Sequence, residues 1–178
     1  MSSYGGKDLA SAFRTVRKNT IQVAEDIPEA QYGHVAAPDC RSVARMLTHI
    51  AISTRLGEEL HKKRVTSLVG FNFLEMLERL NAEEAKPRSK AEIMEMLRTQ
   101  GEQFAEWLET LTPEFLDEMV TDADGKTVKS RFERLLGAKE HEMHHRGQLM
   151  LIERQLGIVP HVTRQANERI AQMRAAKA

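Results

Sequence analysis

The sequence predicts an all-α fold, a four-helix bundle with a small β-hairpin before the last long helix. The chain of 178 residues contains only 5 prolines and 10 glycines, and long stretches that lack both leave few places for strands and turns. Within these stretches the apolar residues recur at steps of three and four, which is the spacing of one helix face. Four such stretches of roughly 20 residues each, joined by loops, indicate a bundle.

The first two predicted helices are separated by a loop. The first runs from Asp8 to Ile27, because its apolar face repeats regularly and the following proline cannot continue a helix. Residues 29–38 read as a connecting loop that is bounded by prolines. The second helix begins near Asp39, whose carboxylate is expected to cap its N-terminus, and continues to Arg64.

The middle of the chain contains a short helix and a long one. Residues 65–86 are rich in apolar side chains but are interrupted by Gly70, and we expect a loop and then a short helix there. Ser89 and Glu92 have the spacing of a capping box, in which the two side chains bind free backbone N–H groups at a helix start. The third long helix therefore begins at Ser89 and ends before the Thr-Pro pair at 112–113.

A hairpin signal precedes the fourth long helix. The Asp-Gly pair at 124–125 stands between two short β-favouring runs in residues 118–128, and both turn positions tolerate a positive φ. The fourth helix spans Ser130 to Leu156, after which a glycine and a proline end it. The polar tail, residues 161–178, is expected to form a marginal helix on the surface.

Composition excludes several classes of function. The 26 basic and 26 acidic residues give a formal net charge of zero, and the basic residues are scattered, so nucleic acid is not an expected partner. No apolar run approaches the roughly 18 residues that span a bilayer, and the first residues lack a secretion signal pattern. We therefore expect a cytoplasmic protein that has no membrane partner. The single cysteine, Cys40, excludes an intrachain disulfide and a thiolate metal cluster.

Histidine remains as a metal ligand, and the chain has 7 of them. His141 and His145 are one helical turn apart, so their side chains point within roughly 40° of one another and can share one ion. Both fall on or beside the apolar stripe of the fourth helix, and they should face the bundle interior. His144 is rotated about 100° from His145 and is expected to point elsewhere.

A third histidine, His49, shares an arc of the second helix with apolar side chains. With His141 and His145 it would supply three nitrogen ligands to a divalent ion and leave a coordination position for water or substrate, as in catalytic zinc sites. The alternative is that these are ordinary core histidines that bond to a carbonyl or carboxylate group. The spacing alone leaves both interpretations open.

Three stretches of the sequence are similar to the DinB-like (DinB/YfiT-like) superfamily of metal-binding four-helix-bundle proteins. They are residues 42–51 around His49, the Asp-Gly hairpin, and residues 141–149, which are close to that family's His-x-x-x-His-Arg-Gly-Gln signature. The resemblance covers the chain to about Pro160, so we expect a bundle domain over residues 1–160 and a separate tail over 161–178.

The resemblance has consequences for function. It implies that His49, His141 and His145 are metal ligands, that the bundle pairs into a homodimer, and that the substrate is a small molecule. For some members it implies a metal-dependent hydrolysis or a transfer involving a low-molecular-weight thiol. Nitrogen ligands suit zinc and nickel alike. A shared fold does not fix the reaction, so a bundle that binds a ligand or partner without catalysis is the main alternative.

A metalloprotease is a third hypothesis, because residues 141–145 also fit His-Glu-x-x-His with Glu142 as the general base. The metzincin form fails, since Gln148 and Leu151 occupy the positions of its glycine and third histidine. A glutamate ligand for the other form is available at Glu168, but that residue lies in the polar tail. The bundle also predicts little sheet along which a peptide could bind. This hypothesis is therefore the weakest of the three.

Other residues near the predicted site have simpler expected roles. Glu142 is expected to form a helix–helix salt bridge or to act as an outer-sphere partner of the metal site, and Gln148 is a candidate polar wall residue. His34 and His61 are expected at the solvated surface. Cys40 would precede or open the second helix, where the helix dipole could lower its pKa, although a lone cysteine is more often a small packing residue. The walls of a pocket should come from residues 29–38 and 65–87.

Overall fold

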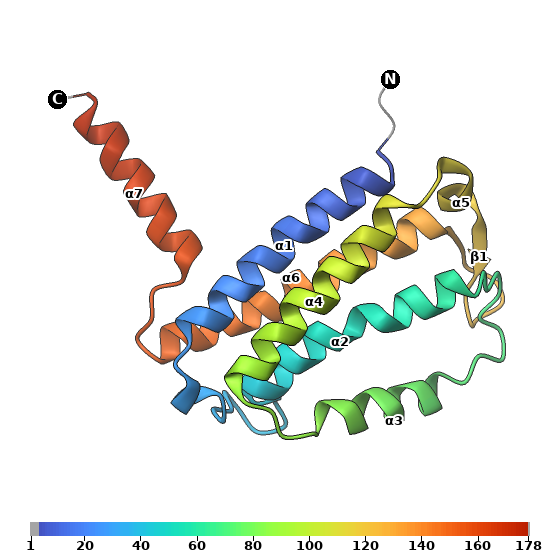
Figure 1. Cartoon of the computed structure of the whole chain (residues 1–178), viewed down its shortest axis with the longest axis horizontal. Helices are drawn as coiled ribbons and strands as arrows, with labels where there is room; N and C mark the ends of the chain where they lie inside the picture. Colours follow the sequence, from blue (N-terminus) through green and yellow to red (C-terminus); the bar gives the residue numbers. More distant parts are fainter. Residues whose placement is uncertain (1–3, 178) are drawn as a thin grey trace.

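The computed structural model describes residues 4–177, and its architecture is the predicted four-helix bundle (Figure 1). The four long helices are α1 (Gly6–Asp26), α2 (Val43–Lys62), α4 (Lys90–Glu109) and α6 (Arg131–Gln155). The shorter elements are a 3-10 turn, η1 (Glu29–Gln31), α3 (Phe73–Glu84), α5 (Pro113–Asp117), β1 (Met119–Thr121), β2 (Val128–Ser130) and α7 (His161–Ala175).

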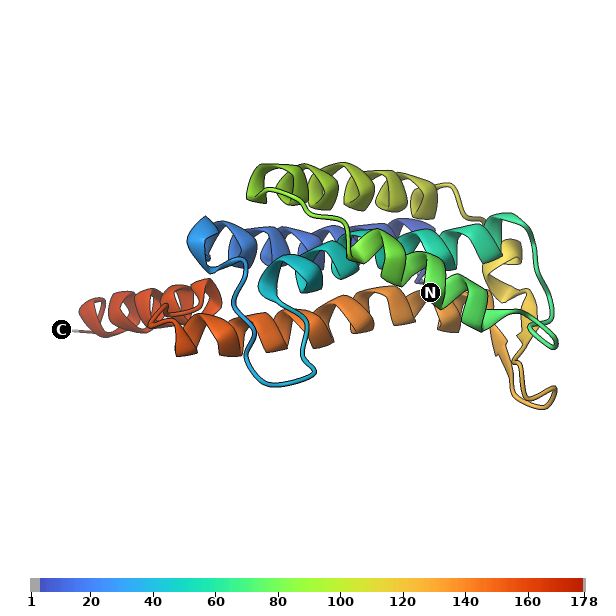
Figure 2. The same ribbon diagram turned by 90° about the horizontal axis from the view of Figure 1, so that it is seen from below.

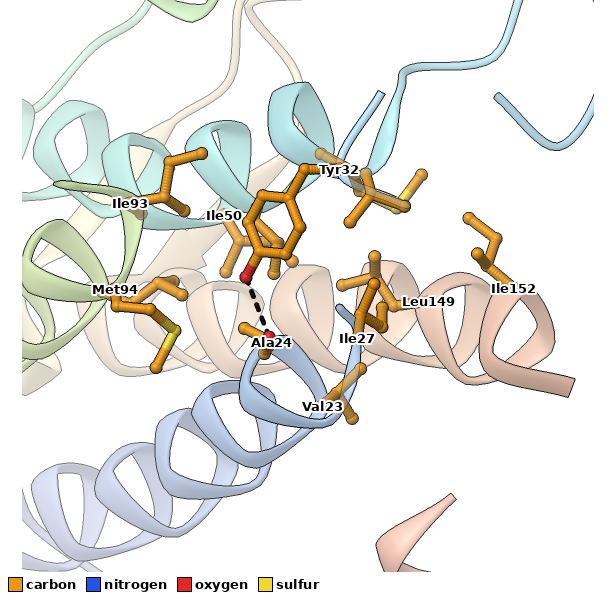
Figure 3. Close-up of a cluster of buried hydrophobic side chains, with 14 residues drawn as sticks. Val23, Ala24, Ile27, Tyr32, Ile50, Ile93, Met94, Leu149 and Ile152 are labelled. Carbon is orange, nitrogen blue, oxygen red and sulfur yellow. Dashed lines mark hydrogen bonds between the residues drawn. The ribbon is translucent and has the colours of Figure 1, made fainter. Parts of the chain in front are cut away.

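The long helices are arranged so that α1 and α2 each pack against both α4 and α6. The pairs α1 with α2 and α4 with α6 therefore lie diagonally across the bundle. One part of the core fills the end that contains η1 and the start of α2, and Figure 3 shows that its side chains come from all four long helices. There the Tyr32 hydroxyl donates a hydrogen bond of 2.8 Å to the carbonyl oxygen of Ala24 (Figure 3). A second core cluster around Phe13 and Phe104 fills the other end.

The helix starts follow the capping chemistry of the sequence, with one exception. Ser89 and Glu92 form the predicted capping box at α4. Asp39 does not cap α2: it lies in the preceding loop with a φ of 65°, and the Ser42 side chain accepts the N–H of Arg45 instead. The predicted cap was three residues too early, because Ser42 pairs with Val35 in an extended bridge, which keeps the chain out of a helix until Val43.

The predicted hairpin lies between α5 and α6. Strands β1 and β2 are antiparallel, with Val120 opposite Lys129. The Asp124 carboxylate accepts the N–H groups of Lys126 and Thr127, and Gly125 has a φ of 68°. Only glycine adopts this left-handed conformation without strain, which explains the Asp-Gly pair at the turn.

Two helices lie outside the four-helix arrangement (Figures 1 and 2). Helix α7 extends past the end of the bundle and is attached at its start, where His161 contacts Asn19 (3.1 Å) and Arg164 pairs with Asp26 (2.7 Å). Helix α3 lies along α2 and leaves Leu74 largely exposed. None of the helices over residues 4–177 combines the length and the apolar character needed to cross a membrane.

Candidate metal centre

The structure brings His49, His141 and His145 together between α2 and α6. The Nε2 atoms of His49 and His141 are 3.0 Å apart, and those of His141 and His145 are 3.2 Å apart. Two nitrogens that share one tetrahedral zinc ion at 2.0–2.1 Å lie about 3.3 Å from each other. The three rings therefore have nearly the spacing that a common ion requires, and a ligand atom from each lies within 4.8 Å of the other two.

The outward nitrogens of two of these rings have hydrogen-bond partners. His49 Nδ1 is 2.6 Å from Glu84 Oε1, and His145 Nδ1 is 2.8 Å from Gln148 Oε1. Both partners are acceptors, so each Nδ1 carries the proton and donates it. The Nε2 lone pairs are then free and point at the common centre, which is the tautomer that a metal ligand needs.

Burial keeps the three rings neutral. Burial, together with the neighbouring His49 and His145, lowers the pKa of His141 to about 4. The pKa of His49 is lowered by burial and by the charge of Arg41, against the opposing effect of Glu84. Burial also lowers the pKa of His145. Neutral imidazole is the form that binds a metal ion, so the site does not need to lose protons near neutral pH.

Glu84, the last residue of α3, is a functional candidate that the sequence did not predict. Its side chain is 1% exposed, and its other oxygen accepts a 2.8 Å hydrogen bond from Arg41. Burial raises the pKa of Glu84, but the hydrogen bond from Arg41 and the proximity of His49 outweigh it, so the net pKa is lowered. An ionised carboxylate behind a ligating imidazole fixes the ring and increases its basicity. The signal in the sequence was only a glutamate at the end of an apolar helix.

Glu142 faces away from the histidine cluster, as its position on the helix predicted. Its carboxylate accepts hydrogen bonds from Arg17 of α1 at 2.9 and 3.1 Å, and the two side chains are 1% and 4% exposed. This confirms the predicted helix–helix salt bridge. A carboxylate held in this way is not free to act as the base of a His-Glu-x-x-His protease, which removes the main support for that hypothesis.

The remaining histidines do not join the cluster. His144 is exposed, as predicted, and His34 is half-buried. The prediction that His61 is solvated was wrong: it is 6% exposed, because α6 and its Arg131 cover the end of α2. His161 is buried against α1 and contacts Asn19. Gln148 bonds to His145 on its own helix.

Two cavities reach the histidine cluster. The first, here called the α2–α6 cavity, has a volume of about 300 Å³ and is lined by His49 and His141 together with apolar side chains. The second, the loop cavity, has a volume of about 430 Å³ and is lined by His145, Gln148 and the loop at residues 36–41. The two segments predicted as pocket walls both contribute, Ala36 and Ala37 to the loop cavity and Leu77 and Leu80 to the α2–α6 cavity.

Cys40 lies in this loop and not at the start of α2. Its residue is exposed and lines the loop cavity. Because α2 begins at Val43, the thiol is outside the first turn in which a helix dipole acts. The expectation of a thiol activated by the helix start therefore loses its physical basis.

Comparison with known proteins agrees with this geometry. A sequence model of the DinB superfamily matches residues 12–149. The chain belongs to the DinB superfamily. Among curated proteins it is similar to the uncharacterised protein YjoA of Bacillus subtilis, with 27% identity over 151 residues that cover 84% of this chain and 89% of YjoA.

Two solved structures share the fold of this DinB-superfamily chain. The crystal structure of YjoA, a DinB-like protein, matches with a TM-score of 0.62 and 23% identity, over 84% of this chain and 91% of that one. YfiT from Bacillus subtilis matches with a TM-score of 0.68 and 16% identity, over 89% and 91% of the two chains. YfiT is described as a probable metal-dependent hydrolase with an unusual four-helix bundle topology.

Proposed function

We propose that this protein is a metal-dependent enzyme acting on a small molecule, with a zinc or nickel ion held by His49, His141 and His145. The observation that carries the proposal is the convergence of three Nε2 atoms. Those of His49 and His145 lie 3.0 and 3.2 Å from that of His141. Imidazole nitrogen suits both metals. Three protein ligands leave an open coordination position, which is typical of catalytic sites and not of structural ones.

The chemistry that we propose is a hydrolysis or the transfer of a low-molecular-weight thiol. When bound, the ion would lower the pKa of a coordinated water or thiol and so make it a nucleophile near neutral pH. The protein's own groups prepare the site: Glu84 and Gln148 hold two imidazoles in place, and the α2–α6 cavity beside them is largely apolar. The description of YfiT supports the metal-dependent part of the proposal.

The two cavities favour transfer over hydrolysis. His49 and His141 line one cavity and His145 lines the other, so the histidine cluster stands between them. Hydrolysis needs room for one organic substrate, whereas a transfer needs room for two molecules. Cavities of about 300 and 430 Å³ lie in the range of small-molecule sites, so each could hold one reactant.

The first test is the metal content of the purified protein. We expect one divalent ion per chain in the wild type, none in His141→Ala, and one in the matched control His144→Ala, because His144 is exposed on the same helix. The metal content of each variant is measured by mass spectrometry, and circular dichroism verifies that each variant folds. The proposal would be contradicted if His141→Ala bound as much zinc and nickel as the wild type does.

The second test concerns the reaction. The metal-loaded protein is screened with small thiols and electrophilic acceptors, and separately with esters and amides in the absence of thiol. Turnover that needs both the metal and a thiol supports the transferase form, and turnover without thiol supports the hydrolase form. Metal binding with no turnover in either screen would favour the non-catalytic ligand-binding alternative.

A further inference from the structure

The α2–α6 cavity is elongated and has two chemically different ends. His49 and His141 lie at one end, and His61 and Arg134 lie at the other. Arg134 and His141 are seven residues apart on α6, which corresponds to about 10 Å along the helix. Small residues, among them Gly57 of α2 and Gly137 of α6, keep the space between the two helices open. The two polar ends are therefore separated by an apolar stretch of about 10 Å along α6 and about 18 Å along α2.

The far end of the cavity presents hydrogen-bond donors. Arg131 Nη1 lies 3.2 Å from His61 Nδ1 and donates to it, so the proton of this neutral ring is on Nε2. Burial, together with the charges of Arg131 and Arg134, lowers the pKa of His61 to about 4. His61 is thus a neutral ring whose remaining N–H group is a donor on the cavity wall.

The arginine that lines this end of the cavity has a donor group without an acceptor. Arg134 donates through Nη2 to Val120 O and to Asp122 Oδ1, at 3.1 and 2.8 Å, whereas its buried Nε has no partner among residues 4–177. Buried donors without partners are costly, and a ligand oxygen would satisfy them.

The charged side chain on the cavity wall at this end is that of Arg134. Arg64 and Arg131 share the carboxylate of Glu118, and Arg134 pairs with Asp122. Of these three arginines, Arg134 lines the α2–α6 cavity, whereas Arg64 is 66% exposed. Guanidinium binds carboxylate with both charge and geometry in its favour, and the Nε of Arg134 is the donor that remains for it.

We propose that the His61–Arg134 end of the α2–α6 cavity binds the carboxylate of an elongated apolar substrate, whose reacting group then lies beside His49 and His141. The position of the reacting group rests on the proposed metal-dependent function. The carboxylate subsite does not, because Arg134 lies about 10 Å along α6 from His141 and His61 lies about 18 Å along α2 from His49. The two proposals can therefore fail independently.

The test compares the binding of octanoate and 1-octanol to the full chain by calorimetry. Both probes have the same apolar chain, and only octanoate has a carboxylate. We expect octanoate to bind at one site and about tenfold more tightly than 1-octanol, which corresponds to one additional charge-assisted hydrogen bond. The measurement is made on the protein as purified and after treatment with a chelator. A preference for octanoate only in the metal-loaded protein would place the carboxylate on the ion and overturn the subsite.

Two substitutions locate the binding site. Gly137→Leu fills the cavity, and Gly147→Leu is its matched control on the same helix, since a Cβ at either position meets no described atom within 4 Å and Gly147 lines none of the cavities described above. We expect Gly137→Leu to abolish octanoate binding and Gly147→Leu to leave it unchanged. Both variants should fold, because leucine is the better helix former. Equal binding by the two variants would overturn the proposal.

A third substitution tests the carboxylate contact itself. Arg134→Lys keeps the positive charge and the ability to pair with Asp122, but it removes the planar set of N–H donors. We expect this variant to bind 1-octanol as the wild type does and to lose most of the preference for octanoate. An unchanged preference would show that Arg134 does not hold the carboxylate.

Discussion

The buried pair Arg17–Glu142 offers the sharpest test of how the four helices are held together. The Arg17 guanidinium of α1 donates to Glu142 of α6, to the carbonyl oxygen of Leu97 in α4 at 2.8 Å, and to that of Ile50 in α2 at 3.3 Å. One side chain therefore joins all four long helices. The substitution Glu142→Gln removes the negative charge and retains the shape.

The expected loss of stability follows from this geometry. Breaking a buried ion pair by removing one partner costs about 3–5 kcal/mol, because the other charge stays buried without compensation. Arg17 retains its two carbonyl acceptors, and the glutamine oxygen can still accept one hydrogen bond. We therefore expect the lower value, about 3 kcal/mol in the free energy of unfolding, or a Tm lower by roughly 10 °C for a domain of this size.

The assay is urea unfolding, followed by circular dichroism and tryptophan fluorescence. The matched control is Glu140→Gln, an exposed position on the same helix, which should change the unfolding free energy by less than about 0.5 kcal/mol. The double variant Arg17→Met with Glu142→Met should recover most of the loss, since apolar side chains of similar volume often replace a buried ion pair without cost. A loss below about 1 kcal/mol in Glu142→Gln, outside the range for breaking a buried pair, would refute the reasoning.

Three further predictions concern the metal centre, pH and helix packing. Glu84→Gln should weaken zinc binding by about tenfold or more in calorimetry, because His49 loses its charged partner. Burial raises the pKa of the fully buried Glu153 from 4.5 to about 7, so the folded state binds this proton more tightly than the unfolded state does. The free energy of unfolding should fall by about 3 kcal/mol between pH 4.5 and 7 because of this group, and denaturant titrations of Glu153→Gln should lack that fall. Gly6→Ala should lower the Tm, because its Cβ would lie 2.4 Å from a carbonyl oxygen of α4, whereas Gly147→Ala should not.

The local elements were predictable because each has a chemical cause within a few residues. The capping box at Ser89, the Asp-Gly turn and the apolar repeat of α6 all act over one or two turns of chain. Helix α5 was missed, because Thr112 and Pro113 end one helix and also cap the next. The start of α2 was misplaced for a similar reason: Asp39 and Ser42 are both good capping residues, and only the pairing of Ser42 with Val35 decides between them.

The histidine cluster was predictable only in part. The spacing of His141 and His145 fixes their common face whatever surrounds the helix. Placing His49 opposite them required the bundle as well. Neither Glu84 nor His61 could be assigned in this way, because their burial depends on contacts made far along the chain, with Arg41 for the first and Arg131 for the second. The sequence pattern around a buried glutamate does not distinguish it from a solvated one.

The candidate site lies between the two neighbouring long helices that pack least closely against each other. Helix α1 packs closely on α4, whereas α2 and α6 make the sparsest contact among the four long-helix pairs that touch. Glycines and histidines face each other across that contact, so a cavity takes the place of a core there. The ion pair between Arg17 and Glu142 holds α1 and α6 together behind the cavity. The apolar clusters at the two ends of the bundle provide most of the stability. The α2–α6 face can therefore keep buried polar groups that lack partners, although each of them lowers the free energy of unfolding.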